Sequence, residues 1–354
     1  MPVRKEHPLN SAPPRPTRRL ARRPRRVRVL LAIGLAVLLP LGAVGLLLHR
    51  LADRYDVRHQ TLLDPDARRA TQTRSQATLT GPLNYLVIGT DRRPAQHHPD
   101  ERADTILIVH VPAGLRRAYL VSVPRDLLIA IPPEPDVGYG GGTDKINAAL
   151  HYGGGGATGA RLLSATLTAV TGLRFDGAAI VDFAAFQQVI NLIGGITVCV
   201  ETEVRSIHTG RLFPAGCHEM DGETALDFAR QRYGLPGGDH DRQRHQQQIL
   251  KAVLTKLAVG DVLTNPLRLD HLIRAVTSAI TVDTNGVSAP DAVRALRGLR
   301  PEALVGLRVP TVSSTIDEVS YEVLAPGAQE LFAALRSGET DAWAARYPAW
   351  VNDL

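Results

Sequence analysis

The sequence predicts an α/β domain with a mixed central sheet flanked by helices, a three-layer α/β/α arrangement, preceded by a single transmembrane helix. Two observations predict this fold class. Apolar runs typical of strands begin near Asn84, Arg102 and Tyr119, and later strand patterns alternate with helical ones. A separate run of about 20 uncharged residues precedes them, at 29–48.

Residues 1–28 form a basic segment that we expect to be disordered and cytoplasmic. They hold ten Lys and Arg residues and one Glu, so they carry +9 in a chain whose net charge is +6. The rest of the chain therefore carries −3, and the basic balance gives no support to nucleic-acid binding by the folded part. With 354 residues, 44% of them apolar, the chain can bury a full core.

The apolar run at 29–48 matches a bilayer core of roughly 30 Å at about 1.5 Å per residue. The arginines before it place the N-terminus in the cytoplasm and everything from His49 onward outside the cell membrane. A cleaved signal peptide and a buried core helix are the alternatives, but no small-residue cleavage site precedes His49. We expect a stalk at 49–82, an extracytoplasmic catalytic domain at 83–340 and a C-terminal tail at 341–354.

Charged residues lie at the tips of the first three predicted strands. Residues 109–117 form a Pro/Gly turn too short for a crossover helix, so the second and third strands should form an antiparallel hairpin. If the first strand is antiparallel to the second, Asp91, Asp104 and Arg125 share one edge of the sheet. Two carboxylates beside an arginine predict a site for a hard cation and an oxyanion.

Helix and strand patterns then alternate along the chain. The predicted segments are an exposed loop at 132–143, helices at 157–171, 183–192, 290–299 and 327–335, and strands at 175–181, 196–200 and 305–310. The glycine run 153–156 lacks the Gly-Lys-Ser/Thr ending of a nucleotide-binding loop. A flexible entry to the next helix is the alternative to a phosphate-binding role.

The segment 230–248 is the densest polar stretch outside the basic tail. Asp221 is expected to cap a helix through Ala229. Arg230 and Arg232 can share a target only if that helix stops near Ala229, because residues i and i+2 point to the same side of an extended chain but not of a helix. A solvated charged surface is the alternative.

A second helix should begin at Asp239 or Asp241. Arg242 and Gln246 are four residues apart and therefore share one face of it. Free backbone N–H groups and the positive end of the helix dipole lie near these side chains, which favours an anion with several oxygens. The expected buried stripe is Ile249, Leu250, Val253, Leu254 and Leu257.

Cys199 and Cys217 are the two cysteines of the chain, and both lie beyond the predicted span. Thiols oxidise in that compartment, so we expect a disulfide, with two unpaired cysteines as the alternative. Its loop of about 18 residues is worth about 3 kcal/mol in the chain-entropy model.

From about residue 84 to 257, the chain resembles the LytR-CpsA-Psr family of cell-envelope enzymes. The motifs that carry the resemblance are Gly89-Thr-Asp-Arg-Arg93, Arg102-Ala-Asp-Thr105, Val121-Ser-Val-Pro-Arg-Asp126, Lys145-Ile-Asn-Ala-Ala149, Leu192-Ile-Gly-Gly-Ile196, Asp221-Gly-Glu-Thr-Ala-Leu226, Arg230-Gln-Arg232 and Asp241-Arg-Gln-Arg-His-Gln-Gln247. The resemblance implies that Asp91 and Asp104 hold Mg²⁺, with Mn²⁺ as the alternative. The side chains that it places around a polyprenyl pyrophosphate head group are Arg93, Arg125, Arg230, Arg232, Arg242 and Gln246.

One position departs from the family pattern. The family usually has arginine directly before the glutamine pair, where this chain has His245. Imidazole is shorter and not permanently charged. Either His245 faces away from the site or neighbouring Arg244 supplies the charge.

The resemblance implies a membrane-anchored phosphotransferase that moves a glycopolymer from a polyprenyl-pyrophosphate carrier onto peptidoglycan. We expect no nucleic-acid partner. The expected catalytic residues are Arg125, Asp126, Arg230 and Arg232. Asp126 or a metal-ligating aspartate is the expected base. The lipid tail is expected against Leu162, Leu167, Phe183, Phe186 and Ile190, with ordinary core packing as the alternative for this apolar stripe. The alternatives are a lipid-pyrophosphate hydrolase and a non-catalytic module that binds lipid-linked polymer. The Ala/Arg/Gly-rich composition and paired cysteines suggest an actinobacterial protein and arabinogalactan as the polymer.

Overall fold

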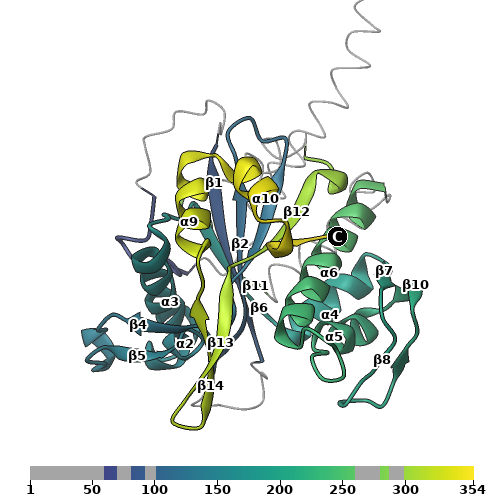
Figure 1. Cartoon of the computed structure of the whole chain (residues 1–354), viewed down its shortest axis with the longest axis horizontal. Helices are drawn as coiled ribbons and strands as arrows, with labels where there is room; N and C mark the ends of the chain where they lie inside the picture. The colour runs from purple at the N-terminus through teal and green to yellow at the C-terminus, as the bar shows by residue number, and fades with distance from the viewer. Residues whose placement is uncertain (1–59, 70–80, 92–100, 260–279, 287–298) are drawn as a thin grey trace, which may run out of the picture. The chain divides into compact units, whose positions relative to one another are not determined.

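A seven-stranded mixed sheet lies at the centre of the computed structural model, which describes residues 60–69, 81–91, 101–259, 280–286 and 299–354 (Figure 1). All of these belong to one compact unit, residues 52–354. In spatial order the strands are β11 (Ile280–Asp283), β6 (Gly177–Asp182), β1 (Leu83–Thr90), β2 (Ala103–Val111), β3 (Ala118–Ser122), β12 (Leu304–Arg308) and β15 (Val351–Asn352).

Strand directions confirm the pairings predicted for the first three strands. β2 runs antiparallel to both β1 and β3. β6 pairs parallel with β1, and β12 pairs parallel with β3, so the sheet is mixed. The tips of β1 and β3 and the start of β2 therefore lie at the same edge.

Helices cover both faces of the sheet (Figure 1). The helices are α2 (Ala148–Tyr152), α3 (Gly156–Thr171), α4 (Phe183–Leu192), α5 (Gly222–Ala229), α6 (Asp239–Val259), α9 (Ala328–Ser337) and α10 (Thr340–Arg346), with short 3-10 helices η1 (Pro135–Val137), η2 (Pro301–Ala303) and η3 (Pro348–Trp350). The predicted helix 183–192 is confirmed, and those at 157–171 and 327–335 are confirmed to within two residues. The glycine run ends α2 and begins α3, where Glu101 accepts a hydrogen bond from Gly156 N at 3.0 Å.

The alternation of side chains along β1 separates the two faces. Leu86 and Ile88 are fully buried in the main core, together with residues of α3 and α9. Val87 and Gly89 point to the opposite face, where they line a cavity beside α4, α5 and α6. One face of the sheet is therefore core, and the other carries the cavity.

Short two-stranded sheets surround this framework. They are β4 (Leu128–Ile131) with β5 (Gly142–Lys145), β7 (Ile196–Val200) with β10 (Gly216–Met220), β8 (Val204–Arg205) with β9 (Leu212–Phe213), and β13 (Thr311–Ile316) with β14 (Val319–Leu324). The predicted strand 196–200 therefore exists, but it pairs outside the central sheet. Cys199 lies opposite Cys217 in this pair, and the predicted disulfide between them is confirmed.

Two of the predicted domain boundaries differ from the structure. Leu62 and Leu63, expected in the stalk, are fully buried in the main core. The expected tail at 341–354 supplies most of α10 and also β15, which pairs with β12. The burial of both segments depends on partners that are distant in the sequence, which local periodicity does not reveal.

The predicted span at 29–48 and the helix at 290–299 lie outside or almost wholly outside the described residues. Within the described ranges, no helix combines the length and apolar character needed to cross a bilayer.

Candidate active site

Asp104 projects from a β-bulge at the charged edge of the sheet. Gly89 lies opposite Thr105 and Thr90 opposite Ala103, so Asp104 is the additional residue of β2. A Cβ on Gly89 would lie 2.8 Å from Thr105 Cβ, so glycine is needed for this close approach. The main-chain oxygen of Asp104 accepts a hydrogen bond from Arg242 Nη2.

Arg125, just beyond β3, is the centre of the charge cluster. Its Nη1 donates to Asp104 Oδ1 at 2.5 Å, and its Nε lies 3.7 Å from Asp126 Oδ2 and 3.9 Å from Asp239 Oδ1. Burial alone would lower the pKa of Arg125, but the carboxylates of Asp104, Asp126 and Asp239 raise it above the usual value. Arg125 is therefore a permanent cation held in place from three sides.

The end of α5 and the start of α6 bring in the arginine segment as predicted. Asp221 caps α5 by accepting from Thr224 N at 2.8 Å, and the helix ends at Ala229. Arg230 and Arg232 follow in the connection, and both line the cavity.

The second helix begins at Asp239, one of the two predicted starts. Arg242 and Gln246 lie on its cavity face. Arg242 Nη2 contacts Asp239 Oδ1 at 2.7 Å and donates to Asp104 O at 3.2 Å, so it joins α6 to β2. Gln246 Nε2 donates to Ala229 O at 3.4 Å and joins α6 to the end of α5.

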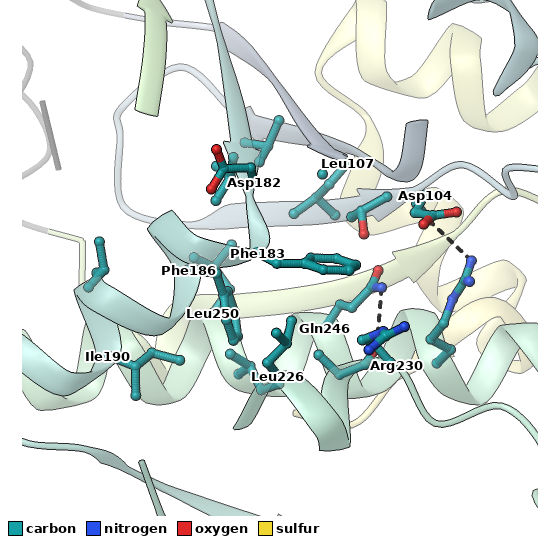
Figure 2. A pocket seen from close by; sticks show the side chains of 18 of the residues that line it. Asp104, Leu107, Asp182, Phe183, Phe186, Ile190, Leu226, Arg230, Gln246 and Leu250 are labelled. Atoms are coloured by element: carbon teal, nitrogen blue, oxygen red, sulfur yellow. Dashed lines mark hydrogen bonds between the residues drawn. The ribbon is translucent and has the colours of Figure 1, made fainter. Parts of the chain in front are cut away.

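These side chains form the polar end of a cavity of about 400 Å³ (Figure 2). The predicted site residues that line it are Asp104, Arg125, Arg230, Arg232, Arg242 and Gln246. Its other walls are apolar and include Leu107, Phe183, Phe186, Ile190, Leu226 and Leu250. Figure 2 shows Asp104 and Arg230 at one end and Phe186 and Ile190 toward the other.

The four arginines divide into two pairs. Arg125 and Arg242 have carboxylate partners within 2.7 Å. Among the described residues, Arg230 and Arg232 have no carboxylate partner: their guanidinium groups lie over aromatic rings, Phe183 at 4.9 Å and Tyr233 at 4.6 Å. Two positive charges at the cavity are therefore left without compensation by these described groups.

Some predicted site residues are placed differently. Asp91 follows β1 directly and is exposed, but it does not line the cavity. Asp126 also lies outside the cavity lining, paired with Lys145 Nζ at 3.0 Å. Arg93 lies outside the described residues.

Some of the residues predicted to contact the lipid line the cavity, and others do not. Phe183, Phe186 and Ile190 of α4 line the cavity. Leu162 and Leu167 of α3 do not, because α3 covers the opposite face and both leucines are buried in the main core. The prediction was wrong for these two residues.

The side chain of His245 faces away from the cavity. His245 is buried and stacks on Phe228 with ring centroids 4.0 Å apart. Burial, and then Arg244, lower its pKa to about 4, so the ring is neutral at pH 7. Arg244 pairs with Glu201 and Asp241 and does not line the cavity either.

Two residues that sequence reasoning had not placed at the site contribute to it, Asp239 from outside the cavity lining and His208 from within it. Asp239 fixes the orientation of Arg242 through their ion pair, and the i, i+3 spacing of the two residues could have indicated this pairing from the sequence.

His208 lines the cavity from the loop between β8 and β9, whose Ser206 donates to Asp227 Oδ1 at 2.6 Å. Burial, and then Arg230, lower the pKa of His208. No local pattern marks this histidine, since only the fold of the loop brings it to the cavity.

Comparisons with known proteins place the chain in a family. A model of the LytR_cpsA_psr family matches residues 55–337. A probable cell wall biosynthesis protein, LcpB of Corynebacterium glutamicum, is 30% identical over 229 residues, which are 61% of this chain and 51% of the relative. Polyisoprenyl-teichoic acid–peptidoglycan teichoic acid transferase TagU of Enterococcus faecalis is 26% identical over 212 residues, 59% of this chain and 65% of that protein.

The chain spans about half the length of the two corynebacterial relatives that it matches. A crystal structure of a Streptococcus agalactiae protein shares the fold, with a TM-score of 0.61 and 20% identity over 73% of this chain and 88% of that one. Since the family model covers well over half of the sequence, the chain belongs to the LytR_cpsA_psr family.

Proposed function

We propose that this chain is a membrane-anchored transferase that moves a glycopolymer from a polyprenyl-pyrophosphate carrier onto peptidoglycan. The observation that carries the proposal is the cavity with apolar walls and an arginine-rich end (Figure 2). A polyprenyl pyrophosphate has the same division into an apolar chain and a multiply charged head. The name of the TagU relative, with its polyisoprenyl donor and peptidoglycan acceptor, supports the same assignment.

Charge at the polar end favours a diphosphate. Arg125 and Arg242 are fixed by Asp104 and Asp239, whereas Arg230 and Arg232 have no carboxylate partner in the described part of the chain. Guanidinium suits paired contacts to phosphate, so Arg230 and Arg232 are the groups that the described carboxylates leave free to bind a diphosphate.

The oxygen donors at this edge fit Mg²⁺, which in proteins often takes one or two carboxylates together with substrate phosphates and water. Asp104 lines the cavity and Asp91 follows the adjacent strand, so these two residues would hold the ion. No group of three or more His, Cys, Asp or Glu side chains in metal-binding arrangement occurs among the described residues, so the substrate would complete the coordination. When bound, the cation would neutralise charge on the diphosphate.

In the proposed reaction, an acceptor hydroxyl oxygen forms a bond to the phosphorus that carries the glycopolymer. The bond from that phosphorus to the bridging oxygen breaks, and polyprenyl phosphate leaves with the electron pair. Arg125, Arg230, Arg232 and Arg242 stabilise the charge on the phosphoryl oxygens during this transfer.

The hydroxyl proton needs an acceptor. The predicted candidates are Asp126 and a metal-ligating aspartate, and of these Asp104 is the better placed. It lines the cavity, whereas Asp126 lies outside the lining, paired with Lys145 Nζ at 3.0 Å. We therefore propose Asp104 as the base and Asp126 as a residue that orients Arg125.

We further propose a single-pass topology with the domain outside the cell. The apolar run at 29–48 and the basic residues before it support this topology. The Cys199–Cys217 disulfide supports an oxidising compartment. Arabinogalactan is the polymer that we propose from the composition.

The test is an assay of the full chain with a defined lipid-pyrophosphate sugar, Mg²⁺ and cell-wall fragments, with product analysis. Transfer should require the fragments and should stop when a chelator removes the cation. Release of free sugar phosphate at the same rate without fragments would identify a hydrolase instead. Binding of the donor with no turnover under any condition would identify a binding module.

A further inference from the structure

Phe183 occupies the boundary between the charged and apolar ends of the cavity (Figure 2). It is the first residue of α4 and directly follows Asp182, which caps the helix by accepting from Ala185 N at 2.8 Å. The start of α4 fixes the backbone at this point. The ring is half-buried, and none of the three apolar clusters in the described ranges includes it. Core packing therefore does not account for its position.

The Phe183 ring lies against a cation. Arg230 Cζ lies 4.9 Å from the centre of the ring, a distance within the range of cation–π attraction. Within the described part of the chain, the Arg230 guanidinium has neither an ion pair nor a side-chain hydrogen bond, so the ring is the group that orients it. Arg125 and Arg242, by contrast, are held by carboxylates.

A carboxylate partner would orient Arg230 but would also cancel its charge. An aromatic face orients a guanidinium through the ring quadrupole and leaves the net charge available to an anion. The same ring presents an apolar surface to the cavity, beside Phe186 and Leu226.

We infer that Phe183 is a positioning residue, which holds Arg230 toward the diphosphate at the point where the apolar chain of the donor begins. The identity of the ligand rests on the proposed function, but the contact between ring and guanidinium does not. Loss of the aromatic face should therefore weaken binding of the phosphate head itself, and not only binding of the lipid chain.

The test compares Phe183→Leu, which removes the quadrupole but keeps an apolar side chain, with Phe183→Tyr, which keeps both. The matched control is Phe186→Leu, the same change one turn further along α4 in a residue that also lines the cavity. Binding of inorganic pyrophosphate and of a short prenyl pyrophosphate is measured by calorimetry on the full chain. Thermal melting checks folding, and Phe183→Met replaces the leucine variant if that variant does not fold.

We expect F183L to weaken the binding of inorganic pyrophosphate about tenfold, whereas the affinity of F183Y should stay within about threefold of that of the parent chain. F186L should weaken binding of the prenyl compound only. In a background of Arg230→Met, F183L should cost no further affinity for inorganic pyrophosphate. Equal losses for F183L and F183Y, or additive losses with Arg230→Met, would overturn the inference. If the parent chain binds inorganic pyrophosphate no less tightly than the prenyl compound, the proposed lipid donor is wrong, while the comparison of variants still decides the role of Phe183.

Discussion

Two buried histidines should make the folded domain lose stability as the pH falls below about 6.5. His110 and His245 are 0% and 4% exposed, and the pKa of each is lowered from 6.5 to about 4. Burial is the larger cause in both, followed by Arg69 for His110 and by Arg244 for His245. In the unfolded chain, both rings protonate near their usual pKa.

The sign follows from proton counting. Between pH 6.5 and 4 the unfolded state binds more protons than the folded state, so the free energy of unfolding rises with pH in that window. The contribution is complete above the unfolded pKa of 6.5 and is lost progressively until the pH reaches about 4. With about 1.36 kcal/mol for each pKa unit, each histidine costs about 2–3 kcal/mol at pH 4.5, and the two together cost about 5 kcal/mol.

Substitution His245→Phe isolates one of these two contributions. Phenylalanine can keep the stack on Phe228, which has its ring centroid 4.0 Å from that of His245, but it cannot be protonated. Urea unfolding at pH 7.5 and 4.5 should therefore show a pH-dependent loss about 2–3 kcal/mol smaller in the variant than in the parent chain. If H245F lost as much stability between these two pH values as the parent chain, the assignment of a depressed pKa to His245 would be refuted.

Three further predictions concern single side chains or bonds. Arg125→Lys should keep the melting temperature within a few degrees but lower transfer about 100-fold in a steady-state assay, because lysine lacks the fork that reaches Asp104 and phosphate together. Gln247→Leu should lower the free energy of unfolding by about 2–4 kcal/mol in urea, because Gln247 lies within 2.9 Å of Leu120 O, Ser122 Oγ, Leu307 O and Asn352 Nδ2, which would lose their buried partner. Reduction of the disulfide, which spans 18 residues, should cost about 3 kcal/mol in the same measurement, and an unchanged unfolding midpoint would contradict it.

The sheet edge could be predicted because short-range features determine it. A turn too short for a crossover helix makes β2 and β3 antiparallel, and this alone places Asp104 and Arg125 at one end of the sheet. The end of α5 at Ala229 was predictable in the same way, since glycine and proline follow soon after in the sequence.

Contacts between distant segments were not predictable from local patterns. β15 has two residues, too few to show strand periodicity, and it is a strand because β12 lies beside it. The pairing of Asp126 with Lys145 depends on the position of the β4–β5 hairpin, which leads Lys145 back to the end of β3. The sequence therefore named charged residues that the fold brings to one region, among them Asp104, Arg125 and Asp126, but could not assign each to the cavity or to its support.

The contact between α5 and α4 sets the position of Arg230 relative to Phe183. Local sequence patterns do not show this contact, so they identified the arginine but not its role. A Cβ on Gly222 would lie 2.3 Å from Gln187 O, so a larger residue there would force the two helices apart. Phe183 belongs to α4 and Arg230 follows α5, and their separation of 4.9 Å depends on this helix contact. Carboxylates orient Arg125 and Arg242, whereas helix packing and an aromatic ring orient Arg230 without neutralising it. A site built in this way keeps its geometry in the absence of ligand and still carries the positive charge that a diphosphate requires.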